Sequence, residues 1–200
     1  LNEDAVVIDT ENEGFAVVDG MGGQGNPVLA TRIVAEELEK AFQTRSLLLD
    51  AHQSAQLRMR RENLQGGACY TALQINGKYA RIQQGGDTGI VLVNTVTGAS
   101  YTAVDEALDR NLFRSVGGRG SALSPQVTAH ELKNNDRFYM ASDGLWDNLD
   151  AEGVVSQTIG MSPRDAVLHL RLLAMEAMAD RANAMSKPDN LSIIVFDKLP

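Results

Sequence analysis

Four aspartates stand where short apolar segments meet residues that favour a tight turn. They are Asp19, Asp87, Asp143 and Asp189. Asp19 directly follows the run Phe15–Val18, and Asp143 directly follows the run Phe138–Ser142. Because an apolar strand holds its own end in place, a carboxylate at that end has a rigid support. Carboxylates that converge without cysteine or clustered histidine are the oxygen ligands that Mg²⁺ or Mn²⁺ prefers.

The same residue types also suit ordinary turns, because Asp-Gly is a common turn dipeptide and aspartate often caps a strand end. Composition and spacing alone therefore leave two interpretations open, a divalent-metal site and a set of unrelated turns.

Other chemistries fit the sequence less well. The glycine-rich stretch Gly20–Gly25 is not followed by Gly-Lys-Ser/Thr, so it is not a phosphate-binding P-loop. Cys69 is the only cysteine, and Ile75 stands where a cysteine phosphatase would need an arginine, so we interpret Cys69 as a small buried strand residue. The histidines lie apart and form no Ser-His-Asp set: His52, His130 and His169.

The composition indicates one ordinary globular domain of 200 residues with a net charge of −8. Such a surface repels nucleic acid and anionic membranes, so neither is an expected partner. No apolar run approaches the length of a membrane span, and no signal peptide is visible. A single cysteine fits a reducing compartment, and we expect a cytoplasmic location. The chain opens at Leu1 without an initiator Met, and we expect it to be a fragment.

Runs of strands and runs of helices alternate in blocks rather than one by one, which predicts an α+β domain with antiparallel sheets covered by helices. The expected strands are Ala5–Ile8, Phe15–Val18, Ala68–Ile75, Tyr79–Gln83, Ile90–Val93, Gln126–Leu132, Arg137–Ala141 and Leu191–Phe196. The expected helices are Pro27–Phe42, a stretch from about Ser46 to Arg60, and a last helix that Ser162-Pro163 begins.

Five segments occur in an order that resembles the metal-dependent PP2C-type (PPM) protein phosphatases, particularly bacterial members. They are Asn2-Glu3-Asp4, Val17–Gly23, Gly85–Thr88, Ser142–Asp147 and Asp189–Ser192. The resemblance covers nearly the whole chain. It implies an α-β-β-α four-layer sandwich, with residues 1–200 as a single catalytic domain that lacks the family's first strand. The family's phosphate-binding arginine would also fall before Leu1.

The resemblance also implies a site with two Mn²⁺ or Mg²⁺ ions and a third in some bacterial members. Asp19 would bridge the two core metals, and the Gly20 carbonyl would bind one of them. Asp143 and Asp189 would complete the other metal's ligands. Glu3 and Asp4 would hold metal-bound waters, and Asp87 and Asp147, with Asp143, would bind the third metal.

The implied activity is hydrolysis of phosphoserine and phosphothreonine in proteins by a hydroxide that bridges the metals, which would oppose a serine/threonine kinase. The expected partners are phosphoproteins and that kinase, with the chain as a monomer. Met21 stands where many members have a histidine that can act as general acid, and the flap segment between Asp87 and Gly117 is short. A pseudophosphatase or regulatory domain that binds phosphoproteins, and a bacterial sporulation or stress phosphatase with one dedicated substrate, stay open as alternatives.

Overall fold

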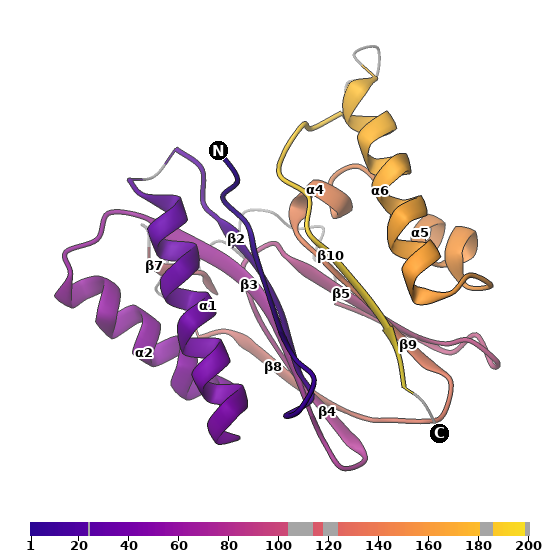
Figure 1. The fold of residues 1–200 in the computed structure, drawn as a ribbon, viewed down its shortest axis with the longest axis horizontal. Coiled ribbons are helices and arrows are strands. Elements are labelled where there is room, and N and C mark those ends of the chain that lie inside the picture. Colours follow the sequence, from indigo (N-terminus) through magenta and orange to yellow (C-terminus); the bar gives the residue numbers. More distant parts are fainter. Residues whose placement is uncertain (24, 104–113, 118–123, 181–185, 199–200) are drawn as a thin grey trace.

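The fold consists of two antiparallel sheets with helices outside them (Figure 1). The computed structural model describes residues 1–23, 25–103, 114–117, 124–180 and 186–198. The first sheet has the order β1-β2-β3-β4-β8, with β7 paired to β3, and the second has the order β10-β9-β5-β6. The strands are β1 (Ala5–Asp9), β2 (Gly14–Gly20), β3 (Gly67–Asn76), β4 (Tyr79–Gly85), β5 (Gly89–Asn94), β6 (Ser100–Ala103), β7 (Val116–Gly117), β8 (Gln126–Glu131), β9 (Asp136–Ala141) and β10 (Ile193–Asp197).

The helices form the two outer layers. They are α1 (Pro27–Thr44), α2 (Leu48–Arg61), α4 (Asp143–Trp146), α5 (Ala151–Thr158) and α6 (Pro163–Ala179). As the sequence predicts, Asn26 caps α1 by accepting the Leu29 N–H at 3.0 Å, and Ser162 caps α6 by accepting the Asp165 N–H at 3.2 Å. None of the helices in the described residues is long and apolar enough to cross a bilayer.

Three buried apolar clusters separate the four layers. One lies between α1, α2 and the first sheet, and includes Phe42 and Tyr70. A second lies between the two sheets, with Leu73 and Phe138 fully buried. The third joins the second sheet to α5 and α6. This succession of helix, sheet, sheet and helix confirms the α-β-β-α sandwich expected from the sequence.

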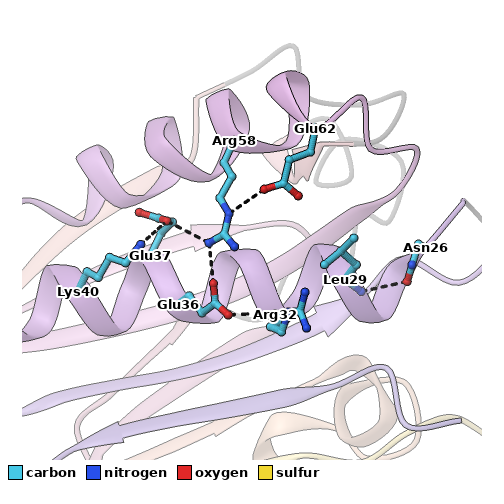
Figure 2. A network of polar contacts seen from close by, with 8 residues as sticks. All are labelled: Asn26, Leu29, Arg32, Glu36, Glu37, Lys40, Arg58 and Glu62. Carbon is cyan, nitrogen blue, oxygen red and sulfur yellow. Dashed lines mark hydrogen bonds and ion pairs between the residues drawn. The ribbon is translucent and has the colours of Figure 1, made fainter.

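An ion-pair network fastens α1 to α2 (Figure 2). Arg58 on α2 places a guanidinium nitrogen 2.6 Å from Glu36 and 3.4 Å from Glu37, both on α1. The same guanidinium pairs with Glu62 at 3.1 Å, just after α2 ends. These side chains are partly exposed, so each pair contributes little on its own, and their value lies in holding the two helices in one register.

Several element boundaries differ from the sequence expectation. The last strand begins at Ile193 rather than at Leu191, because the residues after Asp189 form a loop that packs on α4. The expected helix from about Ser46 begins at Leu48. Four short elements were not expected from the sequence: β6, β7, α4 and α5. Of the short flap segment, residues 104–113 lie outside the described residues.

Candidate metal centre

Asp19 reaches the site because β2 runs straight to it. Val17 and Val18 are fully buried, and Asp19 follows them as the strand's next-to-last residue, opposite Cys69 of β3. The N–H of Gly20 donates to the Glu3 carbonyl at 3.1 Å. This bond draws the N-terminal residues alongside the end of β2.

Asp143 and Asp189 come from the second sheet's side of the molecule. Asp143 is the first residue of α4, separated from the end of β9 only by Ser142, and Asp189 lies in the loop that precedes β10. A side chain on Gly144 would overlap the carbonyl oxygen of Asn190, so glycine is what lets α4 lie against that loop. The strand ends thus bring both carboxylates toward Asp19.

Ser142 and Asn190 join the N-terminal segment to this second group. The Ser142 hydroxyl donates to Asp4 at 2.9 Å and accepts the Ser192 N–H at 3.1 Å. The amide oxygen of Asn190 accepts the Glu3 N–H at 2.7 Å. Both residues belong to the recognised motifs, yet the sequence analysis gave neither a role. Short polar side chains beside the aspartates were the only available signal.

These elements enclose a cavity of about 200 Å³ whose walls are mostly acidic. Of the expected site residues, Glu3, Asp19, Gly20, Asp87, Asp143 and Asp189 line it. Met21 and Cys69 line it too, and no histidine does. Asp4 lies behind the cavity, against Ser142, and Asp147 forms an ion pair with Lys187 at 2.8 Å. The structure therefore brings six of the eight expected residues to one cavity. The charge of Asp4 acts on Asp19 and that of Asp147 acts on Asp143, so both lie near it.

Crowded carboxylates control the electrostatics of the cavity. Burial, together with the charges of Asp143 and Asp4, raises the pKa of Asp19 to about 10. Burial, with the charges of Asp87 and Asp189, raises the pKa of Asp143 to about 6, although a hydrogen bond from Asp19 opposes this shift. Burial also raises the pKa of Asp4. Among the described residues that line the cavity there is no lysine or arginine to supply the positive charge that so many acids require.

Two buried oxygens point to what could supply that charge. Oδ1 of Asp4 and Oδ1 of Asp143 have no hydrogen-bond partner. Within the described residues, however, no three histidine, cysteine or acidic side chains are already grouped as metal ligands. A hydrogen bond joins Asp19 to Asp143, and the raised pKa of Asp19 favours its protonated form. A hard divalent cation would replace that proton and satisfy free carboxylate oxygens, so the donor set fits Mg²⁺ or Mn²⁺ in charge and in chemistry.

The remaining titratable groups that could have competed are structural. His52 is 5% exposed and lies 3.0 Å from the Tyr70 hydroxyl in the helix-covered core. His130 packs against the ring of Tyr101 with 3.9 Å between centroids. Cys69 is a buried residue of β3, as the sequence predicted, and burial raises the pKa of its thiol well above the ordinary value, so this thiol is a poor nucleophile.

This chain is similar to known proteins mainly in its three-dimensional structure and less in its sequence. No family model matches the chain. The 5-azacytidine resistance protein azr1 of Schizosaccharomyces pombe is 27% identical in an alignment of 179 residues that covers 76% of this chain. The chain spans 58% of the length of that relative.

Solved structures match over almost the entire chain. The Staphylococcus aureus serine/threonine phosphatase Stp1 superposes with a TM-score of 0.79 at 20% identity, covering 100% of this chain and 90% of that one. The Mycobacterium tuberculosis serine/threonine phosphatase PstP/Ppp gives 0.76 at 18% identity, covering 100% and 93%. A structure of the PstP catalytic domain with two manganese ions gives 0.76 at 19% identity, with the same coverage of both chains. The chain has the fold of the bacterial PP2C-type serine/threonine phosphatases.

Proposed function

We propose that this chain is a metal-dependent phosphatase that hydrolyses phosphoserine and phosphothreonine in proteins and so opposes a serine/threonine kinase. The observation that carries the proposal is the acidic cavity at the ends of β2 and β9, where burial and neighbouring carboxylates raise the pKa of Asp19 to about 10. A protonated carboxyl group among other acids can exchange its proton for a divalent cation, which would offset the negative charge of the cavity. The fold places this cavity in a sandwich that bacterial serine/threonine phosphatases share.

Each site residue then has a definite task. Asp19 would bridge two cations, and the Gly20 carbonyl would bind one of them. Asp143 and Asp189 would complete the ligands of this pair of ions. Glu3 and Asp4, which Asn190 and Ser142 hold in place, would bind water around the ions. Asp87 and Asp147 would serve a third, accessory cation.

Divalent cations bound there would supply the charge that activates water for in-line attack on phosphorus and offsets charge on the phosphoryl oxygens. The chain's own residues position those ions and keep the cavity polar. No histidine is among the described residues that line the cavity, and we propose that a water molecule gives the proton to the leaving hydroxyl.

The experiment is to strip the protein with EDTA and follow phosphate release from phosphoserine and phosphothreonine peptides and from p-nitrophenyl phosphate. We expect no turnover after stripping and full recovery with Mn²⁺. A folded protein that releases no phosphate from any of these substrates in Mn²⁺ would contradict the proposal and favour a phosphoprotein-binding domain.

A further inference from the structure

A groove of about 460 Å³ runs between β1 and α1, outside the acidic cavity. One wall is the extended segment from Asn2 to Ile8, and the other is the face of α1 from Val28 to Glu39. The two elements run in the same direction (Figure 1), and near one end the Thr31 hydroxyl donates to the Glu3 carbonyl at 2.7 Å.

The strand wall of this groove has an open hydrogen-bonding edge. In the described residues β1 is the outermost strand of its sheet, paired only with β2 (Figure 1). Backbone groups in an antiparallel strand point alternately toward and away from the partner. The Glu3 carbonyl accepts from the Gly20 N–H, so the backbone groups of every second residue after Glu3 also point toward β2. The backbone N–H and C=O groups of Val6 and Ile8 therefore point away from β2. Such an edge is a template for an added strand.

Apolar side chains accompany these backbone groups. Val6 is 44% exposed and Ile8 is 56% exposed, and because they lie opposite Val17 and Phe15 their side chains are on the face of β1 that looks toward the second sheet. Val28 of α1, on the other side of this strand, is 38% exposed. An extended peptide on this edge would therefore bury apolar surface as well as pair its backbone, which is the usual source of affinity when a peptide extends a sheet.

The charge of the walls selects what kind of peptide fits. The lining carboxylates are those of Glu3, Asp4, Glu36 and Glu39, against the guanidinium of Arg32. Glu36 is already paired, with Arg58 at 2.6 Å and Arg32 at 3.8 Å (Figure 2). Glu39 is exposed at the far end and takes no part in that network. The free negative charge therefore favours a basic side chain at that end.

The groove is continuous with the acidic cavity, because Glu3 lines both. We propose that this groove binds the extended segment of a phosphoprotein substrate that flanks the phosphorylated residue, as a strand added to β1, with a lysine or arginine of the segment facing Glu39. The proposal rests on the phosphatase function above. The segment from Asn2 to Ile8 spans about 20 Å at about 3.3 Å per residue, so the basic residue would lie about six positions from the phosphorylated one.

The first test compares phosphothreonine peptides that carry arginine or glutamate about six positions on either side of the phosphorylated residue. We expect kcat/KM to favour the basic peptide by about three- to tenfold at low salt, and Glu39→Lys to remove the preference. Glu176→Lys is the matched control, because Glu176 is also an exposed acid in the C-terminal half of a helix but lies on α6, in the opposite outer layer. Turnover of p-nitrophenyl phosphate, which is too small to reach the groove, should stay unchanged in both variants.

The second test addresses the added strand. Val6→Pro removes an outward N–H and no bond to β2, so the fold should persist, as a thermal melt would verify. Its kcat/KM for the basic peptide should fall by about tenfold with p-nitrophenyl phosphate unaffected. A basic peptide with alternate amides N-methylated should show the same loss on the unmodified protein, which covers the case in which Val6→Pro unfolds.

Failure of this proposal is distinguishable from failure of the phosphatase function. If no substrate is hydrolysed, fluorescence anisotropy of the unphosphorylated basic peptide still reports binding, and Glu39→Lys should weaken it. Equal kcat/KM for the basic and acidic peptides, or an equal loss in Glu176→Lys, would overturn the docking groove. So would a concentration-dependent dimer that Val6→Pro dissociates, since a second copy would then occupy the edge.

Discussion

The ammonium group of Lys187 lies 2.8 Å from a carboxylate oxygen of Asp147. Asn148 holds the backbone of Lys187 in place. Its side chain accepts the Lys187 backbone N–H at 3.1 Å and donates to the Lys187 carbonyl at 3.0 Å. Asp147 follows Asp143 by one helical turn and is the residue proposed for the accessory cation. A positive charge of the chain itself thus already neutralises that carboxylate.

Replacing Lys187 should therefore strengthen accessory metal binding. In Lys187→Gln the Asp147 carboxylate loses its partner, and we expect the weakest Mn²⁺ site in a calorimetric titration to gain about three- to tenfold in affinity, while the core sites keep theirs. Lys133→Gln removes the same charge from an exposed position on another loop and serves as control. Unchanged weak-site affinity in Lys187→Gln would mean that Asp147 does not hold a cation.

The accessory residues should also separate from the core residues on mutation. We expect Asp87→Ala and Asp147→Ala each to lower turnover but to leave two tightly bound Mn²⁺ ions, because neither residue is a proposed ligand of the two core cations. Calorimetric stoichiometry measures this directly. Loss of all tight binding in either variant would assign that residue to the core site instead.

Ser142 should matter for both stability and metal binding. Its hydroxyl is buried and joins Asp4 to Ser192, so Ser142→Ala leaves a buried carboxylate oxygen and a backbone N–H without this partner. We expect a loss of about 1–3 kcal/mol in the free energy of unfolding and weaker Mn²⁺ binding. Urea unfolding with and without Mn²⁺ tests this. Ser156→Ala, on the exposed side of α5, should change neither quantity.

His52 should make stability depend on pH below neutrality. Burial lowers the pKa of His52 to about 4 from an ordinary 6.5, so between these values the unfolded chain binds a proton that the native protein does not. The contribution of His52 to the free energy of unfolding is therefore fully present above about pH 6.5. It decreases as the pH drops toward 4, by at most about 3 kcal/mol.

The measurement for His52 is urea unfolding at pH 7 and pH 5 for the wild type and for His52→Gln. The wild type should lose more stability than the variant on acidification, because glutamine does not titrate. Equal losses in the two proteins would show that His52 is protonated in the native state.

Local patterns predict most strands and helices and the α+β class, whereas the four-layer sandwich and a single site for the acids were implied by the resemblance to the PP2C-type phosphatases. Asp19 and Asp143 could be found because each ends an apolar strand, and strand ends of a sandwich meet in space. The Lys187–Asp147 pair and the Ser142–Asp4 bond could not be found, since they join residues 40 and 138 positions apart through side-chain geometry. The groove along β1 was equally hidden, because an open sheet edge is a property of strand order and not of the strand's own residues.

The most direct test of the metal-dependent mechanism is a calorimetric Mn²⁺ titration of Asp19→Asn, with kcat measured on the same preparation. Asparagine keeps the shape of Asp19 and removes the charge that two cations would share. Because the raised pKa of Asp19 favours its neutral form without metal, the metal-free variant should melt close to the wild type. Met21→Leu, at another residue of the cavity wall, is the control and should bind Mn²⁺ normally. We predict that Asp19→Asn loses the tight pair of Mn²⁺ sites and about a thousandfold in kcat, which corresponds to about 4 kcal/mol of transition-state stabilisation. A folded Asp19→Asn protein with two tight Mn²⁺ ions and turnover close to the wild type would contradict the account.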